Sequence, residues 1–286
     1  MAPPADWPRG PHGPRALAVG LAVVATACSP FAPHPPAPVA PPPAPVRVAV
    51  APPPRPTPIV GDEYRRRYPV KTARDKIVTN RGTGLEQLYG TRNVRAVLNG
   101  VYYRGGANNV FNRDGKRGNS NPLPEGGLAH LCQEGFGTAL YMYPTHFDTA
   151  SPSATCQTFD GDSGHLDYGQ ISVLRGKRDD IRRIIATVYD HVRRPELGPI
   201  YVHCWNGWHA SGYAAAATLR QFCGFSADQA VRYWNLNTDG VNKGASYEAV
   251  RALIRKFEPF PELTISAAEQ AALCPDPETF AFRAAP

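Results

Sequence analysis

The sequence has few of the features that mark membrane-spanning or metal-binding proteins. Beyond its N-terminal stretch, no apolar run approaches the roughly 20 residues that a spanning helix needs. No CxxC spacing occurs among the six cysteines, which disfavours a zinc ribbon and a thioredoxin-type redox pair. Charged residues make up only 19% of the 286 residues, but apolar residues make up 42%. That apolar content is enough for a buried core and excludes wholesale disorder.

Proline, in contrast, is abundant. The chain has 31 prolines, where average usage would give about 14. Fourteen of the 31 lie between residues 29 and 58, interleaved with alanine and valine. Such a tract forms neither a strand ladder nor a helix, and favours a polyproline spacer of the order of 90 Å. We therefore expect residues 29–58 to be a linker and residues 59–286 to be one globular domain of ordinary size.

The first 28 residues resemble an export signal. Arg9 and Arg15 precede an apolar stretch, residues 16–27, which is too short to span a membrane and has the length of a signal h-region. The run Ala25-Thr26-Ala27-Cys28 resembles a bacterial lipobox, with alanine where leucine is most usual. This resemblance implies a lipid on Cys28 and a lipid-anchored, extracytoplasmic location in a bacterial cell envelope. The alternative is an ordinary secretory signal that is cut nearby.

The formal net charge of +7 and the pI near 9.2 favour anionic partners. The basic residues are scattered and no nucleic-acid-binding motif occurs, so we do not expect nucleic acid to be a partner. We also expect no cofactor and no metal. His203, Cys204 and His209 could ligate a metal together, but no fourth ligand is indicated.

Five cysteines follow the signal-like segment. An odd number in an oxidising compartment leaves at least one thiol unpaired. The spacing of Cys132 and Cys156 would suit a disulfide that closes a loop, and Cys223 and Cys274 are further candidates. The sequence leaves the pairing open, because geometry decides it.

Periodicity and turn residues predict alternating strands and helices in the domain. Asn99-Gly100 predicts a two-residue hairpin turn with positive φ at both positions. Ser226 and Gln229 form a capping box. Strands are predicted over 94–98, 101–104, 138–143 and 200–203, and helices over 128–134, 177–194, 211–223, 226–234 and 246–257. This order of elements predicts an α/β fold, with a central sheet flanked by helices.

Residues 200–212, IYVHCWNGWHASG, are the most informative segment. A strand that leads through a tight loop into a helix N-terminus turns backbone amides inward and favours a bound anion. The same field favours a thiolate at Cys204, which makes it the best nucleophile in the chain. Gly207 would let the loop curl, and Gly212 would let the helix pack closely against the sheet.

This segment resembles the signature of the cysteine-dependent protein-tyrosine and dual-specificity phosphatases: His-Cys, five residues, Arg, then Ser or Thr, and often Gly. His203, Cys204, Gly207, Ser211 and Gly212 fall on that pattern. Weaker likeness extends over residues 90–258. It includes the hairpin over 93–106, the unit over 127–143, and a loop at 235–244 that in related enzymes orients the attacking water.

The resemblance implies a phosphatase-like fold in which Cys204 attacks a phosphate ester and water then resolves a cysteinyl-phosphate. His209 and Ser211 are the other catalytic candidates. The implied phosphate-binding loop contains His203, Trp205, Asn206, Gly207, Trp208, Ala210 and Gly212.

Two departures from the family pattern affect the chemistry. Ala210 stands where the signature arginine would fork two phosphoryl oxygens and meet the charge of the transition state. The stretch 171–176, where the family's acid is expected, has no carboxylate. Asp160, Asp162 and Asp167 lie further upstream and would reach the site only from a long loop.

Three interpretations therefore compete. In the first, the domain is a pseudophosphatase that binds a phosphorylated or otherwise anionic ligand without turnover. In the second, it is an active phosphatase in which His209, Lys243 or Arg104 supplies the missing positive charge. In the third, the loop is a structural or redox element with Cys204 in a disulfide or simply packed.

The sequence leaves the roles of several neighbouring side chains open. Trp205 and Trp208 could shape a ligand mouth or serve as packing anchors. His203 is expected to support the loop. Ser211 could cap the helix, hydrogen-bond the thiol, or do both. Asn206 could orient the loop through its amide or have no role.

Overall fold

The computed structural model describes residues 61–108 and 122–283. The expected signal segment with Cys28 and the expected linker, residues 1–58, lie outside the described residues. Within the described ranges no helix combines the length and the apolarity needed to cross a bilayer.

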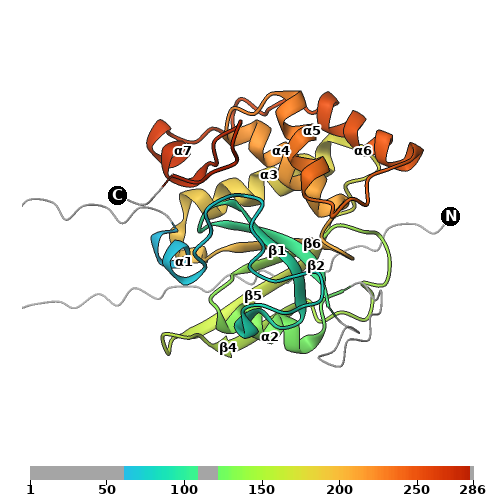
Figure 1. Cartoon of the computed structure of the whole chain (residues 1–286). Helices are drawn as coiled ribbons and strands as arrows, with labels where there is room; N and C mark the ends of the chain where they lie inside the picture. The colour runs from blue at the N-terminus through green and yellow to red at the C-terminus, as the bar shows by residue number, and fades with distance from the viewer. Residues whose placement is uncertain (1–60, 109–121, 284–286) are drawn as a thin grey trace, which may run out of the picture. The chain divides into compact units, whose positions relative to one another are not determined.

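A six-stranded sheet forms the centre of the domain, in the order β1-β2-β6-β3-β5-β4. The inner strands β2, β6, β3 and β5 run parallel, and the edge strands β1 and β4 pair antiparallel with their neighbours (Figure 1). The strand bounds are β1 Thr91–Leu98, β2 Tyr102–Ala107, β3 Thr138–Tyr141, β4 Ser153–Gln157, β5 Ser163–Gln170 and β6 Ile200–Cys204.

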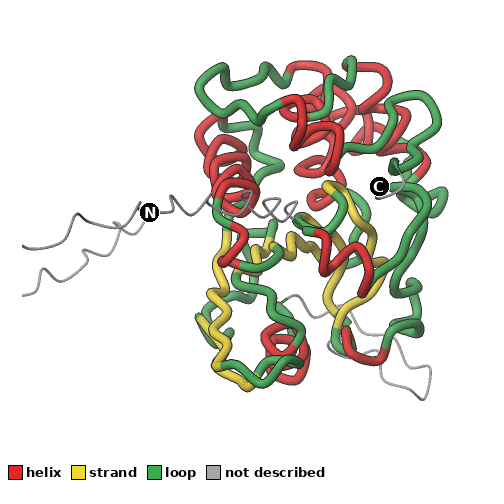
Figure 2. Tube along the Cα trace, turned by 90° about the vertical axis from the view of Figure 1, so that its left-hand side faces the viewer, coloured by secondary structure: helices red, strands yellow, loops and turns green. Residues whose placement is uncertain are grey.

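Helices cover both faces of the sheet and make a mixed α/β fold, as the sequence predicts (Figures 1 and 2). One core lies between the sheet and the group α3 to α7, and a second lies on the face that packs against α1 and α2. The helix bounds are α1 Asp62–Arg67, α2 Glu125–Gln133, α3 Arg178–Arg193, α4 Ala210–Phe222, α5 Ala227–Leu236, α6 Ala245–Lys256 and α7 Ala267–Leu273, with 3-10 turns η1 Glu86–Leu88 and η2 Pro195–Leu197.

The predicted elements are confirmed with small shifts at their ends, and local signals explain them. In α3, Ile181, Ile184, Ile185 and Val188 are buried on one face, as helical spacing requires. α4 is buried over most of its length, because its run of alanines lets the helix approach the sheet closely. The capping box at Ser226 opens α5. β4, β5, α1 and α7 are elements that the sequence did not predict.

The hairpin between β1 and β2 is confirmed, but its turn differs from the expected one. The Val101 N–H donates to the Leu98 carbonyl at 3.0 Å, which closes the turn. Gly100 has a φ of 85°, whereas Asn99 is not among the described residues with positive φ. A turn with positive φ only at its third residue is of the type II kind, and it needs glycine there.

Two disulfides use four of the five cysteines of the domain. Cys132–Cys156 joins α2 to β4, and Cys223–Cys274 joins the end of α4 to the end of α7. Cys204 is free and buried. The interpretation in which a disulfide locks Cys204 is therefore wrong.

Candidate anion-binding loop

The loop that follows Cys204 lies where the parallel strands end. β6 ends at Cys204, residues 205–209 form a tight loop, and α4 begins at Ala210. The register aligns His203 with Tyr141 of β3 and with Gly105 of β2. The carboxyl ends of parallel strands are the usual position of ligand sites in open α/β sheets. We call residues 205–209 the anion loop.

Three successive carbonyls of the anion loop accept hydrogen bonds from side chains of β1 and β2. We call this side of the loop, which faces the sheet, its rear side. Arg92 Nε donates to the Trp205 carbonyl at 3.2 Å. Asn93 Nδ2 donates to the Asn206 carbonyl at 2.6 Å. Arg104 Nη1 donates to the Gly207 carbonyl. The exposed fraction of each of these three donors is 0%.

This arrangement fixes the direction of the next three amides. In a trans peptide, a carbonyl and the N–H of the following residue point in opposite directions, and the described residues contain no cis peptide. The N–H groups that follow these carbonyls therefore point away from the three donor side chains, except where the antiparallel bridge between Gly106 and Asn206 pairs the loop backbone with β2. Successive amides on one side of a turn form an anion-binding concavity, and the first-turn amides of α4 add to it.

Asn93 reaches the loop because β1 is irregular at this point. The register of β1 against β2 shifts between Arg92 and Arg95, and Asn93 has a φ of 50°. A bulge of this kind re-aims a side chain. Asn93 Nδ2 also donates to Asn80 Oδ1 at 2.9 Å. Arg92 and Asn93 are site residues that were not predicted, although polar residues at the start of a buried strand were a usable signal.

Glycines allow the anion loop to lie directly on β2. Gly207 has a φ of 75°, and a Cβ on it would lie 2.6 Å from the Gly105 carbonyl carbon. A Cβ on Gly106 would lie 2.6 Å from the Trp205 oxygen. Gly212, which was expected to pack against the sheet, instead faces the Trp234 indole, where a Cβ would lie 3.0 Å away.

Cys204 lies at the base of the loop with 2% of its surface exposed. Its Sγ is 3.4 Å from Ser211 Oγ, and Ser211 Oγ donates to the Gly105 carbonyl at 3.1 Å. Since the hydroxyl has a single proton, it accepts from the thiol in this arrangement. The expected cap role of Ser211 is wrong: α4 has His209 as its N-cap residue with no side-chain cap, and Ser211 lies inside the first turn.

His203 belongs to a buried hydrogen-bond chain that ends at the cysteine backbone. The Leu123 N–H donates to the Tyr168 hydroxyl at 2.9 Å. Because the Cys204 carbonyl can only accept, Nδ1 carries the proton of the neutral His203 ring, and the Tyr168 hydroxyl therefore donates to Nε2 at 2.8 Å. His203 Nδ1 then donates to the Cys204 carbonyl at 3.2 Å. Burial lowers the pKa of His203 to about 3, so the ring is neutral near pH 7. This geometry is that of a supporting residue.

The two tryptophans of the loop are held by polar contacts on different sides. Trp205 Nε1 donates to the Tyr141 hydroxyl at 2.7 Å, and its ring centroid is 5.1 Å from that of Tyr143. Trp208 Nε1 donates to Asp239 Oδ2 at 3.2 Å. Trp208 is buried and serves as an anchor, whereas Trp205 is half-buried beside the loop.

His209 does not supply a fixed positive charge. Its Nε2 donates to the Val241 carbonyl at 2.7 Å, and its ring centroid is 4.6 Å from that of Tyr247. Burial is the main cause of its lowered pKa, and the charge of Arg104 lowers it further. The imidazole is therefore neutral near pH 7 and bound to the 235–244 loop.

Arg104 and Lys243 are the other two residues that could replace the charge of the signature arginine, and neither projects into the anion loop from the position of Ala210. Ala210 has an exposed fraction of 0% in the first turn of α4. Arg104 donates to backbone carbonyls behind the loop rather than projecting into it. Lys243 is exposed on the 235–244 loop.

The upstream aspartates lie at the opposite end of the sheet. Asp167 of β5 aligns with Thr138, which aligns with Ile200 of β6. Asp162 is five residues before Asp167, and Cys204 is four residues after Ile200. Nine residues of strand correspond to about 30 Å. Neither Asp160 nor Asp162 is therefore positioned to act as an acid at Cys204, and the stretch 171–176 at the near end of β5 has no carboxylate.

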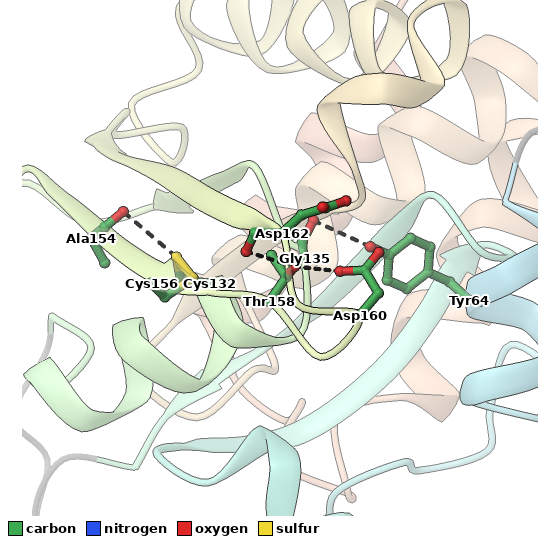
Figure 3. Close-up of a disulfide and its surroundings, with 8 residues drawn as sticks. All are labelled: Tyr64, Cys132, Gly135, Ala154, Cys156, Thr158, Asp160 and Asp162. Atoms are coloured by element: carbon green, nitrogen blue, oxygen red, sulfur yellow. Dashed lines mark hydrogen bonds between the residues drawn. A yellow bond between two sulfur atoms is a disulfide. The ribbon is translucent and has the colours of Figure 1, made fainter.

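That opposite end has a pocket of its own. The turn between β4 and β5 places Asp160 and Asp162 near Tyr64 and the Cys132–Cys156 disulfide (Figure 3). The pocket has a volume of about 390 Å³, and Glu63, Asp160, Asp162 and Glu196 contribute its carboxylates. The described ranges contain no group of three or more side chains arranged to hold a metal ion.

Comparison with known proteins gives limited similarity. No family model matches the chain, and no curated protein matches it. One solved structure, that of Tk-PTP in the active form, is similar in part, with a TM-score of 0.35 and 15% sequence identity. The match covers 57% of this chain and 97% of that chain. At this level the similarity is a weak likeness to a tyrosine phosphatase and says nothing of substrate or activity.

Proposed function

We propose that the domain is a pseudophosphatase, which binds a phosphorylated or otherwise anionic ligand in the anion loop without hydrolysing it. The observation that carries the proposal is the orientation of the loop. Its carbonyls at 205, 206 and 207 accept from buried side chains of β1 and β2, which turns the following amides away from those side chains, apart from the one that pairs with β2 at the Gly106–Asn206 bridge. Backbone amides arranged in this way favour an oxyanion.

The same geometry supports binding over turnover. The position of the signature arginine carries the buried side chain of Ala210, which has no group to fork the oxygens of a transferring phosphoryl. Loss of one donor to a transition-state oxyanion typically costs about 10² to 10³ in rate. Asp162 lies about 30 Å from Cys204 along the sheet, and Asp167 aligns with Ile200 at the start of β6, at the opposite end of that strand from Cys204.

In this proposal the domain is held at the surface of a bacterial envelope through a lipid on Cys28 and a proline-rich linker. The sequence of residues 1–58 supports this part. The two disulfides also support it, because they are typical of proteins that fold outside the cytoplasm.

The test measures binding and hydrolysis separately on the purified full-length chain. Isothermal titration with inorganic phosphate measures binding, and release of nitrophenolate from p-nitrophenyl phosphate measures turnover. We expect the wild type to bind phosphate and to show no hydrolysis that depends on Cys204. Ala210→Arg should gain hydrolysis by about 100-fold or more over the wild-type background.

The control for this gain is the double variant Ala210→Arg with Cys204→Ser, in which the hydrolysis should disappear again. Wild-type hydrolysis that is lost in Cys204→Ser would show instead that the domain is an active phosphatase. Absence of phosphate binding in a folded wild type would contradict the anion loop itself.

A further inference from the structure

Arg104 is a charged side chain that the fold encloses directly behind the anion loop. It is fully buried, and Nη1 donates to the Gly207 carbonyl. Nη2 donates to the Asn237 carbonyl at 3.1 Å, and Nε donates to the Tyr233 hydroxyl at 3.3 Å. A Cβ on Gly212 would lie 3.6 Å from Nη1. The guanidinium therefore lies beneath both the loop and the first turn of α4.

The charge of Arg104 has no carboxylate partner in the part of the chain that the structure describes. Its partners there are two carbonyls and a phenol, which accept from each of its three nitrogens and leave its net charge in place. Arg95, its cross-strand partner on β1, differs because it forms an ion pair with Asp239 at 3.2 Å. A buried charge without a partner is costly to keep unless negative charge comes from elsewhere.

The field of Arg104 reaches the start of α4. Burial lowers the pKa of Arg95 to about 10, and the charge of Arg104 is the next largest cause. The charge of Arg104 also adds to the lowering of the pKa of His209, the N-cap residue of α4, of which burial is the main cause. The charge of Arg104 therefore disfavours a second positive charge at Arg95 and at His209. The same charge attracts an anion that lies near these residues and the loop amides.

We propose that Arg104 supplies, from behind the anion loop, the positive charge that the signature arginine of the resembled family supplies from within it. The bound phosphate-class anion contacts backbone amides and is stabilised through space by the guanidinium. This inference rests on the proposed function. It makes Arg104 a positioning residue, since its fork also ties the anion loop to the 235–244 loop through the Asn237 carbonyl.

The placement also accounts for binding without turnover. A guanidinium fixed to two carbonyls behind the loop raises the affinity for any anion in front of it. It does not form the bidentate hydrogen bonds that would follow the oxygens of a phosphoryl group as it transfers. When the bound anion and the transition state are stabilised equally, the affinity increases but the rate of the chemical step does not.

The experiment is titration of inorganic phosphate into the full-length chain at pH 7, with Arg104→Gln and Arg104→Lys. At an effective dielectric near 20 and a separation of about 7 Å, removing one charge weakens binding by about 50-fold. Arg104→Lys keeps the charge and loses the fork, so we expect its Kd to stay within about fivefold of wild type.

The matched control is Arg220→Gln at the far end of the same helix. Arg220 Nη1 also donates to two carbonyls, those of Ile254 at 2.6 Å and Arg255 at 3.0 Å. Its loss should lower stability and leave the Kd for phosphate unchanged.

Three outcomes decide the inference. A folded Arg104→Gln variant, checked by near-ultraviolet circular dichroism, that binds phosphate as wild type does overturns it and leaves the proposed function intact. If Arg104→Gln does not fold, a folded Arg104→Lys variant with about 50-fold weaker binding overturns it, because the charge is then not what matters. Failure of the wild type to bind phosphate contradicts the proposed function itself.

Discussion

The two ends of the central sheet are built from opposite charges. At the end where β6 stops, buried basic and amide side chains from β1 and β2 donate to three carbonyls of the anion loop. At the other end, exposed carboxylates line a pocket beside a disulfide. The comparison shows why Asp160 and Asp162 do not act with Cys204, because the sheet separates Asp162 from it by about 30 Å. The carboxylate beside the anion loop, Asp239, is instead paired with Arg95, Lys76 and Trp208.

The largest expected effect comes from the disulfides. One variant replaces Cys132 and Cys156 with alanine, and a second replaces Cys223 and Cys274. Loop-closure entropy predicts that each variant loses about 3 to 4 kcal/mol of the free energy of unfolding. Urea unfolding measures this cost. Because Cys132–Cys156 lies at the carboxylate end, its removal should leave the Kd for phosphate unchanged. A weaker Kd in that folded variant would show that the two ends are coupled.

Glycine substitutions at the two ends should separate stability from binding. Gly207 and Gly198 both have positive φ, and a Cβ on either would meet backbone atoms at 2.6 Å or less. We expect Gly207→Ala and Gly198→Ala each to cost about 2 to 3 kcal/mol in thermal or urea unfolding. Only Gly207→Ala should also weaken phosphate binding, because only it displaces the anion loop.

The control is Gly240→Ala, since Gly240 has a φ of 81° and a Cβ on it would meet nothing within 4 Å. It should cost only about 1 kcal/mol. Equal loss of phosphate affinity in Gly198→Ala and Gly207→Ala would contradict the assignment of the anion site to one end.

The expected effect that is smallest near neutral pH is a pH dependence from a buried histidine at each end. The pKa of His203 is about 3 when folded, and burial also lowers that of His191. An unfolded histidine has a pKa near 6.5, so below that pH the unfolded chain binds protons that the folded chain does not. Stability should therefore fall as pH drops below about 6.5, by about 1.4 kcal/mol per pH unit for His203.

Urea unfolding between pH 4 and pH 8 measures this slope in wild type, His203→Gln and His191→Gln. Each variant should show a shallower slope than wild type, and the phosphate Kd should respond only to His203→Gln. An unchanged slope in His203→Gln would mean that His203 is protonated in the folded domain.

Local signals in the sequence predicted the part of the fold that carries the cysteine. The β6 strand, the loop and α4 follow from a short apolar run, a glycine and an alanine-rich helix. β4 and β5 were missed because they contain few apolar residues, although the burial of β5 alternates and its Leu166 and Tyr168 are buried.

The remainder of the site depends on tertiary contacts. Asn93 reaches the loop only because β1 bulges, and Tyr168 reaches His203 only through the register of β5 beside β3. The pairing of Cys132 with Cys156 depends likewise on how α2 packs against the edge strand. Local sequence therefore suggests some of these residues as candidates but does not fix their partners.

The most direct test of the account is to locate a bound oxyanion in a crystal of the chain soaked with tungstate, whose anomalous scattering marks its position. We expect one tungstate within hydrogen-bond distance of backbone amides of the anion loop and of the first turn of α4, in front of the Cys204 sulfur. A tungstate bound elsewhere, with the loop amides turned away from it, would contradict the account.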